Sequence, residues 1–248
     1  MIGEIHTFEN AHTLAGGVAG RILETLSEAV TTSGTASLVL SGGKTPRDVY
    51  QLLGSEDCRD SVPWSLVHLF WGDERCVPPT MPESNYRMAK EVLLDAIGIP
   101  ERNIHRIHGE APPQDAARAY EREIRSALGL RHDAWPHFTL VLLGLGTDGH
   151  VASLFPGTLA LQERKRIVTE VYVESLKSSR ITLTFPALNS AEEIVVLVSG
   201  KLKAPIFQKI RSSDTPEYPA QLVQPVSGRV HWYIDREVAE AGGGWDAP

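Results

Sequence analysis

The sequence predicts an α/β fold in which a doubly wound, mostly parallel sheet is covered by helices on both faces. Two observations support this prediction. Short apolar runs typical of buried strands alternate with longer segments whose apolar residues recur at helical spacing. Turns rich in glycine and polar residues separate such a run from the helix that follows, as in the units of a parallel sheet. With 248 residues, of which 42% are hydrophobic, the chain can bury a sizeable core.

The first part of the chain predicts a helix followed by one strand–turn–helix unit. Asn10 can cap a helix whose apolar residues recur at helical spacing. These residues are Leu14, Val18, Ile22, Leu26 and Val30. Gly34 ends this helix, and residues 36–40 read as a short buried strand. A glycine turn follows, and Pro46 suits the first turn of a second helix that runs to about Leu53.

The rest of the chain repeats this alternation. Further strands are expected at 66–70, 104–107, 138–143, 193–198 and 230–234, and helices at 86–97, 112–128 and 200–210. Residues 180–185 alternate between polar and apolar, which predicts a half-exposed strand. No repeat or change in composition divides the chain. We therefore expect one α/β domain over 1–241, with room for a small inserted subdomain, and a loose tail at 242–248.

Charge and composition limit the classes of partner and compartment. The 24 Lys and Arg against 31 Asp and Glu give a net charge of −7, whereas nucleic acids and anionic membranes select basic surfaces. A small anionic substrate is still compatible, because a few positive groups in a cleft act locally. Cys58 and Cys76 lack CxxC spacing and are expected to be reduced thiols. The N-terminus has no secretory pattern, and the most apolar run, 138–145, is shorter than the about 20 residues that span a bilayer. These features predict a cytoplasmic protein; the oligomeric state is left open, and a monomer is compatible with it.

Polar clusters follow four of the predicted strands, and parallel α/β sheets bind ligands beyond the carboxyl ends of their strands. The loop after residue 40 is a candidate phosphate cradle, although a tight strand-to-helix turn explains it equally well. Its candidate phosphate-binding residues are Ser41, Gly42, Gly43, Thr45 and Arg47. The loop after residue 70 places the carboxylates of Asp73 and Glu74 and the guanidinium of Arg75 directly after a strand. Asp73 is a candidate substrate-binding residue and Arg75 a candidate catalytic one, because arginine suits an oxyanion. Taken alone, that acidic–basic cluster is more often a surface ion-pair group.

The segment from Gly144 to His150 is the strongest candidate for an active-site loop. Three glycines allow the backbone to approach a ligand closely, and they hold His150 at the start of the segment that follows. Histidine is the natural general base near neutral pH. Asp148, two residues earlier, can accept a hydrogen bond from the imidazole or contact a sugar hydroxyl. Arg180 and Lys203 can complete an anion site, although each alone is more often a solvated charge.

Several other patterns argue for or against competing functions. No GxSxG nucleophile elbow is present, which disfavours an α/β-hydrolase mechanism. Residues 144–149 match GxGxxG in letters only, because Asp148 would crowd a pyrophosphate. The pairs His105/His108 and His132/His137 lack the ligand spacing of a zinc site and are expected to be solvated loop histidines.

Taken in order, these loops resemble the glucosamine-6-phosphate isomerase/6-phosphogluconolactonase family, and specifically its lactonases. The matching segments are LSGGKTP at 40–46, WGDERCVP at 71–78, ESNY at 83–86, GLGTDGHVASLFPG at 144–157, RITLT at 180–184, the stretch 200–204 and WYID at 232–235. The similarity covers nearly the whole chain. One departure lies directly before the RITLT strand, where Ser-Leu-Lys-Ser-Ser at 175–179 replaces a proline-rich approach and leaves the geometry before Arg180 open.

The resemblance implies a doubly wound α/β fold and hydrolysis of 6-phosphoglucono-δ-lactone in the oxidative pentose phosphate pathway, with no cofactor and no required metal. It implies that His150 is the general base and that Arg75, Arg180 and Lys203 are the positive groups around the substrate. It also places Ser41, Gly42, Gly43 and Thr45 next to the phosphate.

Two rivals stay open at this point. The first is an aminosugar-phosphate deaminase of the same fold, in which the histidine loop continues to a glutamate that serves ring opening. Here the continuation 151–156 reads VASLFP and has no carboxylate. The second is a non-catalytic sugar-phosphate sensor, which would be expected to carry a basic helix-turn-helix, whereas this chain opens with an acidic N-terminus.

Overall fold

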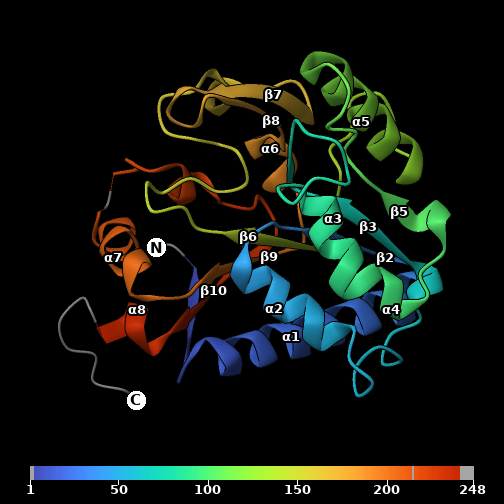
Figure 1. The fold of residues 1–248 in the computed structure, drawn as a ribbon, viewed down its shortest axis with the longest axis horizontal. Coiled ribbons are helices and arrows are strands. Elements are labelled where there is room, and N and C mark those ends of the chain that lie inside the picture. Colours follow the sequence, from blue (N-terminus) through green and yellow to red (C-terminus); the bar gives the residue numbers. More distant parts are fainter. Residues whose placement is uncertain (1–2, 214, 241–248) are drawn as a thin grey trace.

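A single all-parallel sheet forms the centre of the molecule. The computed structural model describes residues 3–213 and 215–240, so the expected loose tail at 242–248 lies outside the described residues. The sheet order is β1-β10-β9-β6-β2-β3-β5 (Figure 1). Its strands are β1 (Glu4–Phe8), β2 (Ala36–Leu40), β3 (Val67–Trp71), β5 (Ile104–His105), β6 (Leu140–Gly144), β9 (Glu193–Val198) and β10 (Arg229–Asp235).

The order of the strands locates the edge at which a sheet of this kind binds ligands. From β2 the chain proceeds outward through β3 and β5 on one side, and from β6 outward through β9 and β10 on the other. The direction of winding therefore reverses between β2 and β6. In open α/β sheets the crevice beyond the carboxyl ends of the strands at such a reversal is where ligands bind.

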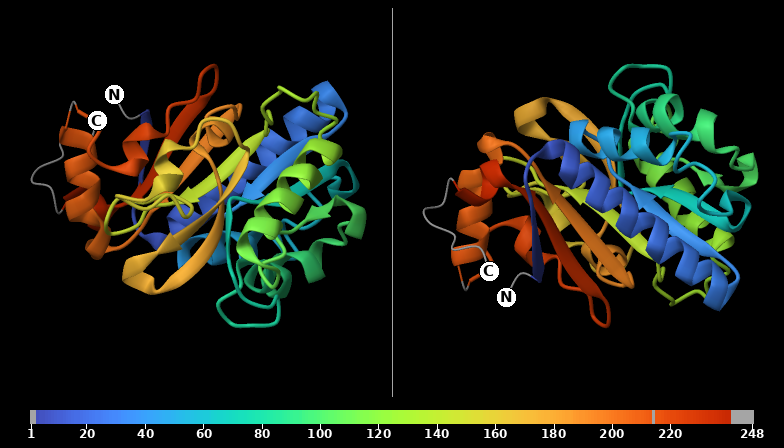
Figure 2. Two further views of the ribbon diagram at one scale, coloured as in Figure 1. Left: turned by 90° about the horizontal axis from the view of Figure 1, so that it is seen from above. Right: turned by 90° about the horizontal axis from the view of Figure 1, so that it is seen from below.

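Helices cover both faces of this sheet, as the sequence predicts (Figures 1 and 2). The helix α1 crosses one face, while α5 and a small second sheet lie over the other. The helices are α1 (Ala11–Ser33), α2 (Lys44–Leu53), α3 (Asn85–Ala89), α4 (Asp95–Ile97), α5 (Pro113–Ala127), α6 (Phe185–Leu188), α7 (Ala204–Ser212) and α8 (Arg236–Glu240), with a π-helical turn at Lys90–Leu94 joining α3 to α4.

The second sheet is antiparallel and has the order β4-β8-β7. Its strands are β4 (Asp73–Arg75), β7 (Val168–Val173) and β8 (Ser178–Leu183). The strand expected at 180–185 corresponds to β8, but the expectation that it is half-exposed is wrong. Its residues Ile181, Thr182 and Leu183 are all buried. The polar Thr182 tolerates burial because its hydroxyl donates to the Leu183 carbonyl at 3.0 Å and accepts from the Ser153 N–H at 3.2 Å.

Most of the expected elements are present, with shifts at their ends. Strands at 36–40 and 193–198 have the predicted bounds, and the Asn10 side chain caps α1 by accepting from the N–H groups of His12 and Thr13. The helix expected at 200–210 starts as a short 3-10 turn, Lys201–Lys203, before α7. Strands β1, β4 and β7 and the short helices α6 and α8 were not expected. β4 has only three residues, and α6 and α8 have four and five, too few for a periodic pattern to show.

Two buried tyrosines fix the strand ends that carry the functional loops. The Tyr50 hydroxyl, from α2, accepts from the Ser41 N–H at 2.8 Å and lies 2.9 Å from the Ser41 carbonyl, to which it donates. The Tyr120 hydroxyl, from α5, makes the same pair of bonds with Trp71 at 2.7 and 2.9 Å. Each hydroxyl satisfies two buried backbone groups where the chain leaves the sheet, so β2 and β3 end at fixed points.

Three other expectations concern the histidines, the cysteines and the membrane. His105 is not a solvated loop residue: it is buried in β5, with its Nδ1 2.7 Å from Glu123 and its Nε2 2.9 Å from His68. Cys58 and Cys76 are both free thiols. None of the described helices combines the length and the apolar character that crossing a lipid bilayer requires.

Candidate active site

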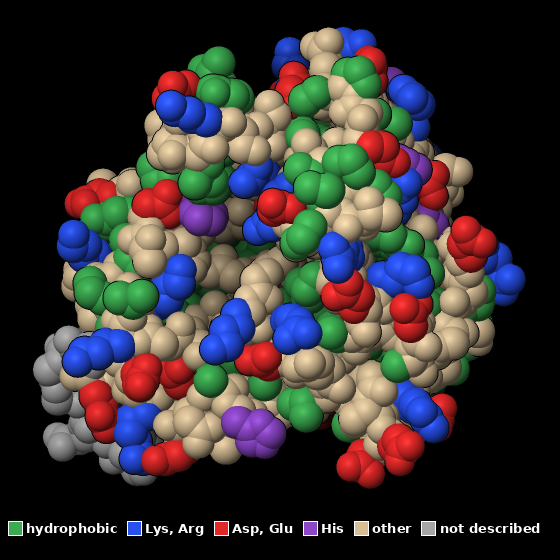
Figure 3. Space-filling view, in the orientation of Figure 1, with side chains coloured by type: hydrophobic (Ala, Val, Ile, Leu, Met, Phe, Trp, Pro, Cys, Tyr) green, Lys and Arg blue, Asp and Glu red, His purple; other side chains and the backbone are tan. Residues whose placement is uncertain are grey.

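A cavity of about 270 Å³ opens at the carboxyl edge of the central sheet, beside the reversal between β2 and β6. Figure 3 shows Lys and Arg side chains gathered around a hollow below the β7–β8 hairpin. The cavity is lined by Ser41, Gly42, Gly43, Asp73, Arg75, Asn85, Gly144, Leu145, Gly146, His150, Ala152, Ser153, Phe155, Leu176, Arg180 and Lys203. A larger cavity of about 360 Å³ lies at the amino ends of β9 and β10, so volume alone does not locate the site.

Eight of the eleven site residues expected from the sequence line this cavity. They come from five segments that are far apart in the chain: the segments after β2, β6 and β9 of the central sheet, and the strands β4 and β8 of the second sheet. The three expected residues outside the lining are Thr45, Arg47 and Asp148. Thr45 and Arg47 lie in the first turns of α2, where the Arg47 side chain is exposed. Asp148 does not line the cavity itself but contacts the lining residue His150.

The imidazole of His150 is held by Asp148. His150 Nδ1 lies 2.6 Å from Asp148 Oδ1, and the same oxygen accepts from the His150 backbone N–H at 3.2 Å. Burial alone would raise the pKa of Asp148, but the charge and hydrogen bonds of His150 outweigh it, so the pKa lies below its ordinary value. The carboxylate thus stays ionised and keeps the proton of a neutral imidazole on Nδ1. His150 Nε2 is then left with a lone pair that can accept a proton.

The ring of Phe155 fixes the other side of His150. The two ring centroids are 4.0 Å apart and the planes are inclined by 28°. Phe155 follows a tight turn in which Ala152 adopts a positive φ of 48°, an uncommon conformation for a residue with a side chain. The imidazole is therefore oriented by an ionic partner at one nitrogen and by an aromatic ring across its face.

Gly146 leaves the space that this arrangement needs. A Cβ atom at this position would lie 2.0 Å from His150 Nδ1 and 2.6 Å from Asp148 Oδ1. The backbone N–H of Gly146 also donates to the His150 carbonyl at 2.8 Å, which closes the loop on itself. Glycine is required here by the close approach of the His150–Asp148 pair.

We expect Gly146→Ala to lower kcat by about 10²-fold, the loss typical of a misplacement of about 1 Å in a catalytic group. The added methyl group would push the imidazole away from Asp148, while the charged groups that bind the substrate stay in place, so KM should change little. Steady-state kinetics measure both constants. Gly20→Ala on α1 is the matched control, because nothing lies within 4 Å of its added Cβ. Unchanged kcat in Gly146→Ala would contradict the proposed geometry.

The loop after β2 presents backbone groups to the cavity. Gly42 packs so closely against Asn85 that a Cβ would lie 2.0 Å from Asn85 Oδ1. Gly43 has a φ of 110° and is the N-cap of α2, where no side chain caps the first N–H groups. The amino end of this helix therefore offers unpaired N–H groups and a positive dipole end at the cavity, which favours an anion.

Two arginines face each other directly across the second sheet. Arg75 on β4 and Arg180 on β8 are register partners in the antiparallel pair, and both line the cavity. Like charges at directly opposed positions destabilise a sheet. Burial, and then the neighbouring Arg75 guanidinium, lower the pKa of Arg180. The pair is an unfavourable arrangement in the free protein that a bound dianion would relieve.

Lys203 adds a third positive group. It ends the short 3-10 turn before α7 and lines the cavity. Burial lowers its pKa, and the Asp148 carboxylate acts in the opposite direction. Within the described residues, its ammonium group has no hydrogen bond or ion pair to another side chain. Lys203 is therefore available to a ligand.

Several residues around the expected Asp73 also shape the cavity, and sequence reasoning assigned no role to them. The Asp73 carboxylate accepts from Ser153 Oγ at 2.6 Å and from Asn85 Nδ2 at 3.3 Å, so these two residues set its orientation. Glu74 is buried, and it accepts from the N–H groups of Arg75, Asn85 and Tyr86, each at 2.8 Å. Asn85 and Ser153 lie within the loop segments 83–86 and 144–157, but no local signal in one sequence shows that they meet Asp73. Phe155 and Leu176 complete the wall.

Comparison with known proteins identifies relatives over nearly the whole chain. Residues 9–232 match the family model described as glucosamine-6-phosphate isomerases/6-phosphogluconolactonase. The chain is 38% identical to 6-phosphogluconolactonase of Synechocystis over 218 residues, covering 87% of this chain and 88% of the relative. Among solved structures, 6-phosphogluconolactonase of Thermotoga maritima aligns with a TM-score of 0.81 and 33% identity over 94% of this chain and 99% of that one. The Trypanosoma brucei enzyme of the same name aligns with a TM-score of 0.86 and 29% identity, covering 96% of this chain and 98% of that one.

Proposed function

The chain belongs to the glucosamine-6-phosphate isomerase/6-phosphogluconolactonase family, and from this we infer that it is one of the family's lactonases. It hydrolyses 6-phospho-D-glucono-1,5-lactone to 6-phospho-D-gluconate, a step of the oxidative pentose phosphate pathway. The observation that supports this function most directly is one cavity that holds an oriented histidine with a free nitrogen and an opposed pair of arginines.

In the proposed mechanism the phosphate fixes the substrate in the cavity. The opposed guanidinium groups of Arg75 and Arg180 bind the phosphate dianion, and the Gly42–Gly43 loop contributes N–H groups. Planar guanidinium groups can form paired hydrogen bonds to phosphate oxygens, which limits rotation of the ligand. Binding energy from the phosphate, which lies far from the reacting carbon, is thereby converted into orientation of the lactone carbonyl.

The chemical step needs one proton acceptor and no covalent nucleophile. His150 Nε2 takes a proton from a water molecule as the water oxygen forms a bond to C1 of the lactone. The positive charge of the cavity stabilises the oxyanion, and Asp148 stabilises the imidazolium. The C1–ring-oxygen bond then breaks, and His150 returns the proton to the departing ring oxygen. The products are the open-chain acid and the free imidazole.

The cavity lacks a carboxylate that the rival deaminase reaction needs. Its family members need a carboxylate after the histidine loop for ring opening, whereas residues 151–156 contain none. The lining contributes one carboxylate, Asp73, and both of its oxygens are already hydrogen-bonded to Ser153 and Asn85. The cavity therefore favours hydrolysis over deamination.

We further propose that residues 1–241 form one catalytic domain that acts in the cytoplasm. The oligomeric state is left open, and a monomer is compatible with the proposed function. The proposed partner is the small sugar phosphate, and the net charge of −7 disfavours nucleic acid.

A direct assay tests the proposed function. A coupled dehydrogenase generates the phosphorylated lactone, and its disappearance is followed with and without the protein. We expect a decay that is proportional to protein concentration and faster than spontaneous hydrolysis. The proposal fails if the decay equals the uncatalysed rate, and the rival is supported if the protein also releases ammonia from glucosamine-6-phosphate.

A further inference from the structure

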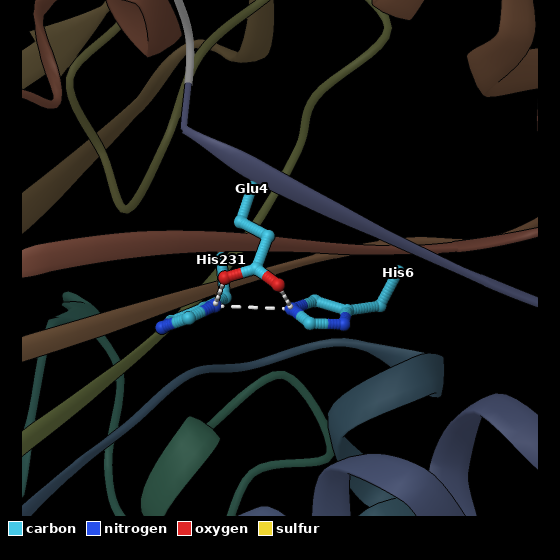
Figure 4. A group of neighbouring side chains, drawn as sticks. All are labelled: Glu4, His6 and His231. Carbon is cyan, nitrogen blue, oxygen red and sulfur yellow. Dashed lines mark hydrogen bonds and ion pairs between the residues drawn. The ribbon is translucent and has the colours of Figure 1, made fainter.

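A second group of chemically active side chains lies at the opposite end of the sheet from the cavity. Glu4 and His6 lie two residues apart on the edge strand β1, so both side chains point to the same face. His231 lies on the neighbouring strand β10, where Glu4 is its register partner. Figure 4 shows the three side chains turned toward one another. This Glu4–His6–His231 group has no part in the proposed hydrolysis.

The three side chains converge on one point. His6 Nε2 lies 3.0 Å from His231 Nδ1. Glu4 Oε1 lies 3.7 Å from His6 Nε2, and Glu4 Oε2 lies 3.5 Å from His231 Nδ1. Among the described residues, this is the one group of three or more His, Cys, Asp or Glu side chains whose ligand atoms all lie within 4.8 Å of one another.

When both imidazoles are neutral, the group has no positive centre. A neutral imidazole carries one N–H. Of the two facing nitrogens, His6 Nε2 and His231 Nδ1, one can donate a hydrogen bond and the other then presents a lone pair. The Glu4 carboxylate has only acceptor atoms and faces both nitrogens. With neutral histidines, one proton thus serves both the N···N contact and the carboxylate. A cation placed between the three groups would satisfy all of them at once.

His231 presents one ring nitrogen to the group. The residue is only 7% exposed, and its buried Nε2 has no hydrogen-bond partner in the described part of the chain, so Nδ1 is the nitrogen that faces Glu4 and His6. The adjacent Glu193 is already neutralised by Arg21, whose Nη2 lies 2.7 Å from its carboxylate. A neutral imidazole with a free lone pair is the form in which histidine binds metal.

We propose that Glu4, His6 and His231 bind a divalent transition-metal cation of the Zn²⁺ type. Two imidazole nitrogens about 2.0–2.1 Å from one tetrahedral ion are about 3.3–3.4 Å apart, so the 3.0 Å between the two nitrogens found here needs to open by only a few tenths of an ångström. Two imidazoles and one carboxylate are ligands that suit Zn²⁺ and its neighbours rather than Mg²⁺ or Ca²⁺. Glu4 is 66% exposed on its side chain, so water has access to complete the coordination.

Metal binding would join the edge strand β1 to β10 by a bond that the backbone ladder does not supply. An ion that binds the folded chain and not the unfolded one stabilises the fold in proportion to the logarithm of its concentration above Kd. The proposed role is structural, and it does not depend on the function of the cavity at the carboxyl edge.

Isothermal titration of the full-length, metal-free protein with Zn²⁺ tests the proposal, and Co²⁺ absorption reports the ligand geometry. We expect one site per chain and no comparable binding of Mg²⁺. His6→Ala should weaken Zn²⁺ binding by at least about tenfold, because losing a ligand costs no less than losing the group that orients one. Glu4→Gln, at an exposed position, should weaken it as well. Neither variant should change the lactonase kcat.

Two control variants separate this site from others. His132 is fully exposed and lies 2.9 Å from Asp133, so His132→Ala removes an equivalent histidine–carboxylate pair and should leave Zn²⁺ binding unchanged. His150→Ala removes the histidine–carboxylate pair at the cavity, His150 with Asp148. The proposal is overturned if His6→Ala binds Zn²⁺ as tightly as the unaltered chain, or if only His150→Ala abolishes binding. Circular dichroism of His6→Ala verifies that lost binding does not reflect lost folding.

Discussion

Replacing His150 with alanine is expected to lower kcat for 6-phosphogluconolactone by about 10²–10⁴-fold, the usual contribution of a general base. The cavity would keep the groups that are proposed to bind the phosphate, because these are Arg75, Arg180 and the Gly42–Gly43 loop. The affinity for the product 6-phosphogluconate should therefore change by less than about tenfold, which is about 1.4 kcal/mol. Steady-state assays corrected for spontaneous hydrolysis give kcat, and isothermal titration gives the affinity.

The matched control for this variant is His132→Ala. His132 has the same kind of contact, with its Nδ1 2.9 Å from Asp133, but it is fully exposed and outside the cavity. It should retain full activity. Near-normal turnover of His150→Ala would rule out the mechanism, and a parallel loss of product binding would show that His150 acts in binding rather than in proton transfer.

Replacing Arg180 with alanine is expected to act mainly on KM. A hydrogen bond to a charged group contributes about 1.5–3 kcal/mol, so KM should rise roughly 10- to 150-fold. The same substitution removes the repulsion between Arg180 and the directly opposed Arg75. We therefore expect the free energy of unfolding to stay the same or to increase. A residue with a structural role would show the reverse, a loss of stability with little change in KM.

Comparison of two substrates sharpens this test. The unphosphorylated glucono-1,5-lactone lacks the group that Arg180 is proposed to bind, so Arg180→Ala should reduce the preference for the phosphorylated lactone. Arg180→Lys keeps the charge but not the planar pair of donors. Its preference for the phosphorylated lactone should therefore lie between those of the unaltered chain and of Arg180→Ala. Arg118→Ala on α5 changes the net charge equally at an exposed position and should alter neither constant. An unchanged preference in Arg180→Ala would place the phosphate elsewhere.

The alternation of strands and helices could be predicted because it depends on local spacing. Apolar residues at period 3.6 or in short runs decide which segments bury a face, and the caps at Asn10 and Gly34 end a helix whatever surrounds it. The same local logic places the glycine loops after strand ends. Since all strands of the central sheet are parallel, those loops must meet at one edge.

The failures of the sequence reading concern burial and pairing. The strand at 180–185 shows polar–apolar alternation but is buried at Ile181, Thr182 and Leu183. The polar Thr182 can be buried because its hydroxyl group accepts a hydrogen bond from the backbone N–H of Ser153. His105 lies in a region that reads as a loop but is buried between His68 and Glu123. In both cases a hydrogen bond to a residue far away in the chain overrides the local tendency of a polar side chain toward solvent.

By itself, then, the sequence determined the α/β fold, the loops at the strand ends and the histidine that the proposed mechanism uses. Only the tertiary structure decided which charges stand opposite one another. The register of β4 against β8 sets Arg75 against Arg180, and the pairing of β1 with β10 brings together His6 and His231, which are 225 residues apart. Strand order and register arise from the packing of the whole chain, so no local pattern records them.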